Sequence, residues 1–492
     1  MADRRNVQNS AKLLKTFQLN SGWERALLLL FVCTLPLMNP WVRGDGVGYY
    51  AFARALLIQR NLDFTPDYQH ANMSFREGRL DESGQPLAYF RTATGHLENH
   101  FTIGPALLWA PFLFAAHAGV LCARALGSDV AADGFTAPYR FAMALGTAFY
   151  GFLGLFVSFR AAKRFVAERW AFLAVAGIWG GSSLAVYMYF NPSWSHAHSA
   201  FAVALFFWYW LETREERSLR QWVLFGVIAG LMLNVYYANA MLLTLVVVEA
   251  IVALRDAVRA SRGDVPALLM RYALFALIVL LCLVPTFICK RIIYGSSVET
   301  GYVPISQWHW TSPYFLQILF SANHGLFSWT PILLLSAIGI FLLWRKAPKV
   351  RGPVLCAFIA FFYFMASYPD WAGISSYGSR FFVSLTVFFV IGLAVLLEKV
   401  VERFRTVRAA TVASSLGLLL FVSWNLGLMF QWGTHLIPAR GPISWREAAY
   451  NQFFVVPRQI TGHLHDYFFR RKDLMRQIEQ RDVQQLKQQN SN

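Results

Sequence analysis

Charged residues are scarce in this chain, which excludes an ordinary soluble globular protein. Only 14% of its 492 residues are charged, whereas 56% are hydrophobic. Soluble domains carry roughly 25% charged residues. Acidic residues are fewer than basic residues, with 27 Asp and Glu against 44 Lys and Arg. In a membrane protein such a basic excess marks the cytoplasmic connections. Because no nucleic-acid-binding motif is present, we expect no nucleic-acid partner.

Motifs of soluble enzymes are also missing. The five cysteines lie in apolar stretches without metal-ligand spacing, so they predict neither a metal site nor a disulfide framework. The chain has no phosphate-binding loop, dinucleotide fingerprint, zinc motif or nucleophile elbow. The sequence shows no alternation of predicted strands and helices, so it does not indicate a nucleotide-sugar domain. Any activated sugar that the protein uses would therefore arrive on a lipid.

What the chain does contain is a series of apolar segments of membrane-spanning length. They lie at 24–40, 104–126, 140–159, 170–190, 197–211, 222–254, 268–288, 329–344, 353–369, 380–398 and 409–430. The segment 222–254 is long enough to form a hairpin of two spans. Basic connections alternate with short connections that lack Lys and Arg, as the positive-inside rule requires. One conflict arises, because two full crossings by 104–126 and 140–159 would place the basic residues of 160–169 outside.

We resolve this conflict by placing 104–126 at the membrane surface, since Gly104, Pro105, Pro111 and His117 interrupt it. The sequence then predicts an all-α polytopic membrane protein with about eleven transmembrane helices. Its N-terminus would lie in the cytoplasm and its C-terminus outside. A count of twelve is the alternative, and it would move the C-terminus inside.

Four regions follow from this topology. Residues 1–22 form a basic cytoplasmic N-terminus, and residues 23–432 form the transmembrane domain. Its first external loop, 41–139, bears helices that lie on the membrane surface. Residues 433–492 are predicted as an amphipathic tail at the membrane, disordered from Gln484 on, which supplies no catalytic group.

The segment 43–50, Arg-Gly-Asp-Gly-Val-Gly-Tyr-Tyr, directly follows the first span. Its glycines free the backbone to bend and let a ligand come close to Asp45. A carboxylate at the bilayer surface is costly unless it is solvated, paired or used in chemistry. A solvated Asp in a helix-ending turn is the alternative. We take Asp45 as the candidate catalytic residue.

Further polar residues are predicted on the same external face. His100 closes the first loop, and His196 lies in a polar turn between two spans, where it is too close to His198 for the two to share a helical face. Arg380 opens a late span, and its guanidinium suits bidentate phosphate binding. Ordinary interfacial packing or snorkelling is the alternative for each. The candidate substrate-binding residues are His100, His196, Lys290, Arg291, Tyr302, His324 and Arg380.

With these residues in view, the chain resembles the GT-C superfamily of integral-membrane glycosyltransferases, in particular bacterial relatives of protein O-mannosyltransferases and aminoarabinose transferases. The likeness rests on the order of Asp45, the segment 100–105, the turn 191–196 and the stretches 323–331 and 371–382. It covers about 24–440. The turn 191–196 lacks the second acidic residue found in many members, so we expect no metal.

The resemblance implies transfer of a sugar from a polyprenyl-phosphate donor to a glycan, lipid or protein acceptor. Asp45 would act as the general base, and no cofactor would be needed. The site would face the exterior of a bacterial cytoplasmic membrane, among membrane lipids. Two alternatives stay open, namely a transporter or flippase of lipid-linked sugars and a non-catalytic partner in a glycosylation complex.

Overall fold

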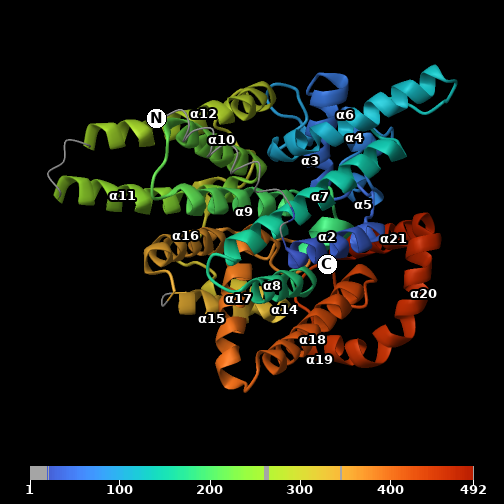
Figure 1. Cartoon of the computed structure of the whole chain (residues 1–492). Helices are drawn as coiled ribbons and strands as arrows, with labels where there is room; N and C mark the ends of the chain where they lie inside the picture. Colours follow the sequence, from blue (N-terminus) through green and yellow to red (C-terminus); the bar gives the residue numbers. More distant parts are fainter. Residues whose placement is uncertain (1–18, 20, 260–264, 344–345, 491–492) are drawn as a thin grey trace.

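The computed structural model describes residues 19, 21–259, 265–343 and 346–490. Within these ranges the chain forms helices joined by loops, and the only strand-like pairing is two isolated bridges. The predicted N-terminal region 1–22 lies almost wholly outside them. The all-α prediction is confirmed. The longer helices, most of them labelled in Figure 1, are α2 Gly22–Thr34, α3 Asp45–Arg54, α6 Gly104–Ala125, α7 Ala137–Ala162, α8 Glu168–Gly181, α9 His196–Thr213, α10 Leu219–Val235, α11 Thr244–Arg259, α12 Val265–Tyr294, α15 Ile332–Leu342, α16 Pro348–Ser367, α17 Thr386–Val400, α18 Val407–Gly433, α20 Val456–Phe469 and α21 Arg471–Asn490.

Helix α17 is almost entirely buried and packs against α7, α8, α9 and α15. Its crossing with α15 depends on two glycines, because a Cβ added to Gly339 would overlap the carbonyl oxygen of Gly392. A similar approach joins α7 to α9, where a Cβ on Gly154 would lie 2.9 Å from backbone atoms of Phe201. Small residues at crossings let backbones approach closely, as is usual for helices packed within a membrane.

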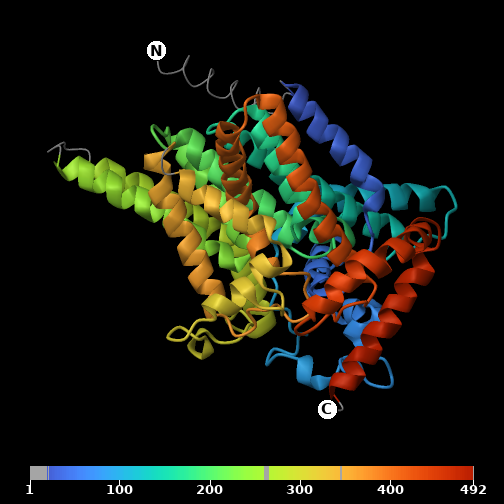
Figure 2. The ribbon, with the colours of Figure 1, turned by 90° about the horizontal axis from the view of Figure 1, so that it is seen from below.

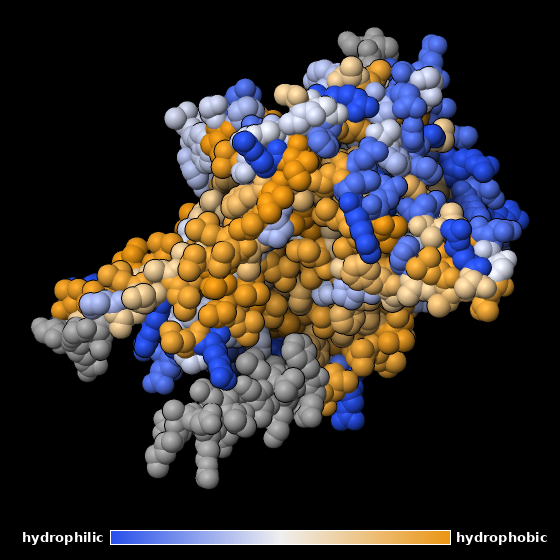
Figure 3. All heavy atoms as spheres, turned by 90° about the horizontal axis from the view of Figure 1, so that it is seen from above, coloured by the Kyte–Doolittle hydropathy of each residue, from blue (hydrophilic) through white to orange (hydrophobic). Residues whose placement is uncertain are grey.

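The outer helices present apolar side chains to their surroundings. Helix α12 exposes Leu277, Leu280, Leu281, Val284 and Ile288. Figure 3 shows a broad hydrophobic surface, with hydrophilic residues gathered mainly at the upper right of that view. A soluble monomer rarely exposes apolar patches of this extent, whereas a surface in contact with lipid tails is expected to be apolar.

Seven helices of the described residues are long and apolar enough to cross a membrane. They confirm a multi-pass membrane protein, although they are fewer than the predicted spans. Two further apolar helices, α10 and α15, are shorter. The seven are Gly104–Ala125, Ala137–Ala162, Tyr237–Arg259, Val265–Tyr294, Pro348–Ser367, Arg380–Arg403 and Val407–Gly433.

Basic connections lie together at one end of the bundle. Arg160, at the end of α7, pairs with Glu24 near the start of α2 at 3.1 Å. Lys346 contacts Glu398 and donates to the carbonyl oxygen of Phe165 at 3.2 Å. Figure 2 shows the start of α2 at the upper end of the view, while α21 and the first loop lie toward the lower end. The ends of α2, α7 and α17 that carry these basic connections are thus on the side opposite to α21 and the first loop.

The first loop folds as a cap of short helices, which include α4 (Thr65–His70) and α5 (Met73–Arg76). A buried ion pair joins α3 to α4, because Arg54 Nε donates to Asp67 Oδ1 at 2.7 Å and both side chains are almost fully buried. A buried charge requires such a partner. Helix α6 follows the cap and is continuous through Pro111, so the predicted interruption is absent. Its placement at the membrane surface stays a prediction.

The tail differs from its prediction. Helix α21 continues to Asn490 and packs against α5, where disorder was predicted from Gln484 on. Glu479 explains this docking, because its buried carboxylate accepts hydrogen bonds from Asn72 Nδ2 at 2.9 Å and from the backbone N–H of Ser74 at 2.9 Å. We call these contacts the Glu479 clasp. Residues 491 and 492 lie outside the described part of the chain.

Candidate active site

Asp45 is the first residue of α3, and two glycines determine its position. Gly44 has a φ of 53°, in the left-handed region that favours glycine. A Cβ added to Gly46 would overlap the hydroxyl oxygen of Ser193. The segment that carries Asp45 therefore lies directly against the turn 191–195, and a larger residue at position 46 would push the two apart.

The Asp45 carboxylate is paired with Arg380. Asp45 Oδ2 lies 2.7 Å from Arg380 Nη1, and the two side chains are 35% and 11% exposed. The guanidinium of Arg380 stacks over the Trp194 ring at 4.5 Å, and Trp194 Nε1 donates to the carbonyl oxygen of Arg43 at 2.9 Å. Arg380 is thus fixed by an aromatic face on one side, while Asp45 keeps part of its carboxylate open to the cavity.

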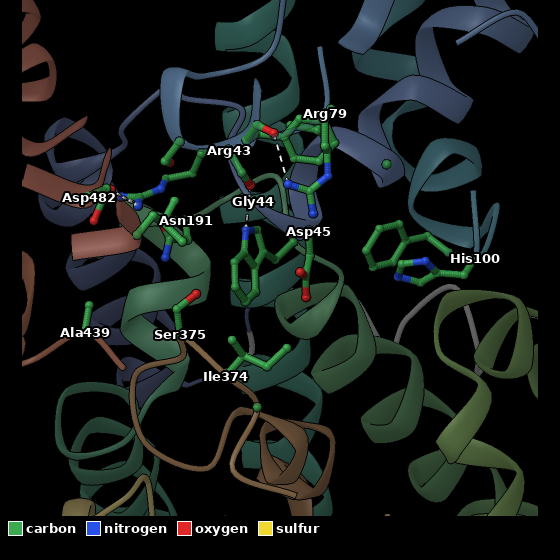
Figure 4. A pocket seen from close by; sticks show the side chains of 18 of the residues that line it. Arg43, Gly44, Asp45, Arg79, His100, Asn191, Ile374, Ser375, Ala439 and Asp482 are labelled. Atoms are coloured by element: carbon green, nitrogen blue, oxygen red, sulfur yellow. Dashed lines mark hydrogen bonds and ion pairs between the residues drawn. The ribbon is translucent and has the colours of Figure 1, made fainter. Parts of the chain in front are cut away.

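A cavity of about 230 Å³ lies beside this pair. Its walls come from the first loop, the turn 191–194, the connection 373–375 and the tail. Figure 4 shows Asp45 near the middle, with His100 on one side and Asp482 and Ala439 on the other. The charged and histidine residues in these walls include Arg43, Asp45, Arg79, His100, Arg380 and Asp482.

Three buried nitrogen atoms around Arg380 have no hydrogen-bond partner among the described residues. They are Arg380 Nε, His196 Nδ1 and His324 Nε2. His324 has a φ of 59°, and its Nδ1 lies 2.9 Å from the carbonyl oxygen of Ala372. Burial lowers the pKa of His324 to about 4, with a further contribution from the charge of Arg380. Buried polar atoms are normally satisfied, and of these three residues only Arg380 lines the cavity, so its Nε is the nitrogen placed to meet a polar ligand there.

His100 and Tyr302 lie together, with ring centroids 4.6 Å apart. Burial lowers the pKa of His100 to about 4, although the charge of Asp45 opposes this shift. His100 is therefore neutral at pH 7 and is suited to hydrogen bonding with a hydroxyl group more than to pairing with a phosphate. Nearby, Ser195 donates to the Tyr49 hydroxyl at 2.8 Å, and burial raises the pKa of Tyr49.

Five of the predicted substrate-binding residues do not line the cavity, namely His196, Lys290, Arg291, Tyr302 and His324. Lys290 Nζ is buried and donates to the carbonyl oxygens of Asn99 at 2.9 Å and Thr300 at 3.1 Å. It holds the end of the first loop against the loop after α12. Arg291 is exposed and donates to the carbonyl oxygen of Gly295 at 2.6 Å.

Sequence reasoning missed the contribution of the tail. Asp482, Gln485 and Leu486 of α21 line the cavity, and Asp482 Oδ2 lies 2.6 Å from Arg43 Nη2. The tail thus forms part of the cavity wall, and the prediction that it supplies no catalytic group stays a prediction. One signal was present, since Glu479 and Asp482 are three residues apart and share a helical face in a polar run.

No group of three His, Cys, Asp or Glu in the described ranges is placed to hold a metal ion. Neither a model of a known protein family nor a curated protein matches this chain.

Proposed function

We propose that the protein is a glycosyltransferase that moves a sugar from a polyprenyl-phosphate donor to an acceptor hydroxyl, in the manner of the GT-C superfamily that the sequence resembles. The observation that carries this proposal is the Asp45 carboxylate, which is held by Arg380 and partly open to a cavity. Arg380, which lines this cavity, has an Nε atom without a hydrogen-bond partner among the described residues. Such a combination of a fixed base and an unused hydrogen-bonding group suits a ligand rich in hydroxyl groups.

In the proposed reaction the Asp45 carboxylate takes the proton of the acceptor hydroxyl as its oxygen attacks the anomeric carbon of the donor sugar. The new carbon–oxygen bond forms while the bond from that carbon to the phosphate oxygen breaks. The electron pair of the broken bond leaves with the polyprenyl phosphate. Arg380 holds the carboxylate in position, and neutral His100 offers a hydrogen bond to a sugar or acceptor hydroxyl. No cofactor or metal is required by these steps.

The surroundings of the site support a lipid-linked donor. The cavity lies at the end of a bundle whose outer helices are apolar, so a polyprenyl chain has a surface to follow. Arg380 was predicted to pair with the donor phosphate, and in the structure its Nη1 contacts Asp45. We therefore assign Arg380 to orientation of the base first.

We further propose eleven spans, with the site on the external face of a bacterial cytoplasmic membrane. The contact between Arg160 and Glu24 supports this count, because it places the end of α7 beside the start of α2. Helix α2 then crosses once and α7 returns once, while α6 stays at the membrane surface. The basic connections gathered at that end would face the cytoplasm.

The test is transfer from a radiolabelled polyprenyl-phosphate sugar by purified Asp45→Asn protein. A positioned base contributes about 10²–10⁴-fold, so we expect a rate loss of that size with unchanged folding. Asp63→Asn is the matched control, since Asp63 is an exposed carboxylate in the same loop. Equal transfer by wild type and Asp45→Asn would remove the proposed base.

A flippase of lipid-linked sugars is the competing function, and it needs no base. It would leave the bond between sugar and phosphate intact, so thin-layer separation of labelled donor from labelled product distinguishes the two functions in the same assay.

A further inference from the structure

Four arginines line the cavity, and their partners divide them into two pairs. Arg380 is matched by Asp45, and Arg43 is matched by Asp482. Arg79 and Arg440 also line the cavity, but neither has a carboxylate within ion-pair distance among the described residues. The cavity therefore contains two guanidinium groups whose charge the protein itself leaves without a direct counter-ion.

Arg79 is held in place without a carboxylate. It follows α5 in the first loop, and its Nη1 donates to the carbonyl oxygen of Phe75 at 3.0 Å. The guanidinium stacks over the Phe75 ring at 4.5 Å. Figure 4 shows the Arg79 side chain beside the cavity. Glu98 also lines the cavity, and it forms no ion pair with Arg79 within the described ranges. The other nitrogens of Arg79 make no hydrogen bond to this part of the chain.

Arg440 comes from the opposite part of the sequence, the connection between α18 and α19 (Trp445–Tyr450). Its side chain is half-buried and makes no hydrogen bond to any described residue. Burial lowers the pKa of Arg440, and the charge of Arg79 adds to this shift while that of Asp482 opposes it. Both arginines line the same cavity, one from the first loop and one from the connection before α19.

We propose that Arg79 and Arg440 together bind an anionic oxygen group of a substrate, a phosphate or a carboxylate, in the part of the cavity next to α21. An anion bound in this cavity would give both guanidinium groups the counter-ion that no described carboxylate supplies, and guanidinium groups are suited to bidentate binding of such groups. The inference rests on the proposed glycosyl transfer for its place in the reaction. It adds a charged anchor that is separate from the Asp45–Arg380 pair.

Two sources of this anion differ in what they predict. If the donor supplies it, a polyprenyl monophosphate binds through these arginines, and polyprenol of the same length does not. If an acidic acceptor supplies it, inorganic phosphate binds through the arginines, while binding of the lipid phosphate does not depend on them.

The experiment measures binding of all three probes to the purified full-length protein in detergent. Arg79→Gln and Arg440→Gln are the test variants, and Arg76→Gln is the control, because Arg76 is exposed nearby and outside the cavity. We expect each test variant to weaken binding of the monophosphate about tenfold or more, given about 1.5–3 kcal/mol for hydrogen bonds to charged groups. Polyprenol binding should not change, and Arg79→Lys and Arg440→Lys should keep part of the affinity if the Gln variants fold poorly.

Weaker binding of inorganic phosphate alone would support the site and assign its anion to the acceptor. Unchanged binding of both phosphate probes in correctly folded Gln variants would overturn the proposal. The binding assay needs no turnover. If the protein has no transfer activity but still binds phosphate through the two arginines, the proposed function is refuted and the proposed anion site is supported.

Discussion

The Asp45–Arg380 pair and the Glu479 clasp both border the cavity, but different parts of the fold hold them. Arg380 begins the segment that continues into α17, which is almost entirely buried. Glu479 lies on the terminal helix, which contacts the rest of the chain along one face and exposes several polar residues on the other. The residues proposed for chemistry thus belong to the buried helix bundle. One wall of the cavity instead belongs to α21, and separating α21 from the bundle costs less free energy than opening the bundle itself.

The largest effect should come from breaking the inner pair. In Arg380→Gln the Asp45 carboxylate loses its counter-ion and Trp194 loses the stacked guanidinium, so the base is no longer fixed. Misplacement of a reacting group costs about 10²-fold in rate, and we expect a loss of that order in transfer. Arg380→Lys should be intermediate because it keeps the charge without the planar fork.

Arg291→Gln is the control for that change, since Arg291 is exposed and outside the cavity. Full activity of Arg380→Gln in a correctly folded protein would show that the pair is structural only.

Removal of α21, which forms one wall of the cavity, should have a smaller effect on transfer. The sequence alone predicts that truncation after Tyr467 leaves transfer largely intact. Because α21 lines the cavity, we expect instead that truncation after Arg470 raises the apparent KM for the lipid donor about tenfold, with a smaller change in kcat. Steady-state kinetics in detergent measures both parameters. An unchanged KM would mean that α21 covers the cavity without affecting the substrate.

The Glu479 clasp can be loosened without removing the helix. Glu479→Gln keeps one acceptor oxygen for Asn72 and Ser74, but it replaces Oε1, which accepts from Asn72 Nδ2 at 3.0 Å, with an NH2 group that would face the NH2 group of Asn72. A lost hydrogen bond to a charged group costs about 1.5 kcal/mol or more, so amide hydrogen exchange in α21 should accelerate about tenfold. Asp473→Asn, an exposed acid on the same helix, should exchange as wild type does. Equal exchange in both variants would show that Glu479 does not anchor α21.

The smallest effect is a loss of folding stability at acidic pH. His324 is buried and neutral in the folded protein, because its pKa is lowered from 6.5 to about 4. The unfolded chain takes up this proton first, so the contribution of His324 to stability is present above pH 6.5 and is lost as the pH falls toward 4. By pH 5.5 the loss should be about 1 kcal/mol. Thermal unfolding at pH 7.5 and 5.5 should show a smaller difference for His324→Gln than for wild type, and equal differences would contradict the assignment.

Local patterns were enough to find the inner site. Glycines around Asp45 and the placement of His100 and Arg380 beside spans predicted three residues that line the cavity. Lys290 and Arg291 show where such patterns fail. Consecutive residues of a helix point about 100° apart, so one of them is buried against the loop and the other is exposed. The polarity of the two residues alone does not predict which of them faces the loop and which faces outward.

The outer part of the site depends on contacts over long sequence separations. Arg79 and Arg440 line one cavity because the tail returns to the first loop, and no periodicity in either segment predicts that return. Glu479 finds its partners on Asn72 and Ser74, roughly 400 residues earlier in the chain. The sequence therefore predicts only part of the helix in the tail, and it does not predict that this helix packs against the first loop.

The central claim is that this cavity breaks the bond between a sugar and a lipid phosphate. The most direct measurement is a single-turnover reaction of excess purified protein with a polyprenyl-phosphate sugar labelled in the sugar, in the presence of an envelope extract that supplies acceptors. The account predicts that label leaves the lipid and appears in a new glycoside, and that Asp45→Asn binds the donor but does not transfer the label. Label that stays on the lipid with wild-type protein while moving across a vesicle bilayer would contradict it.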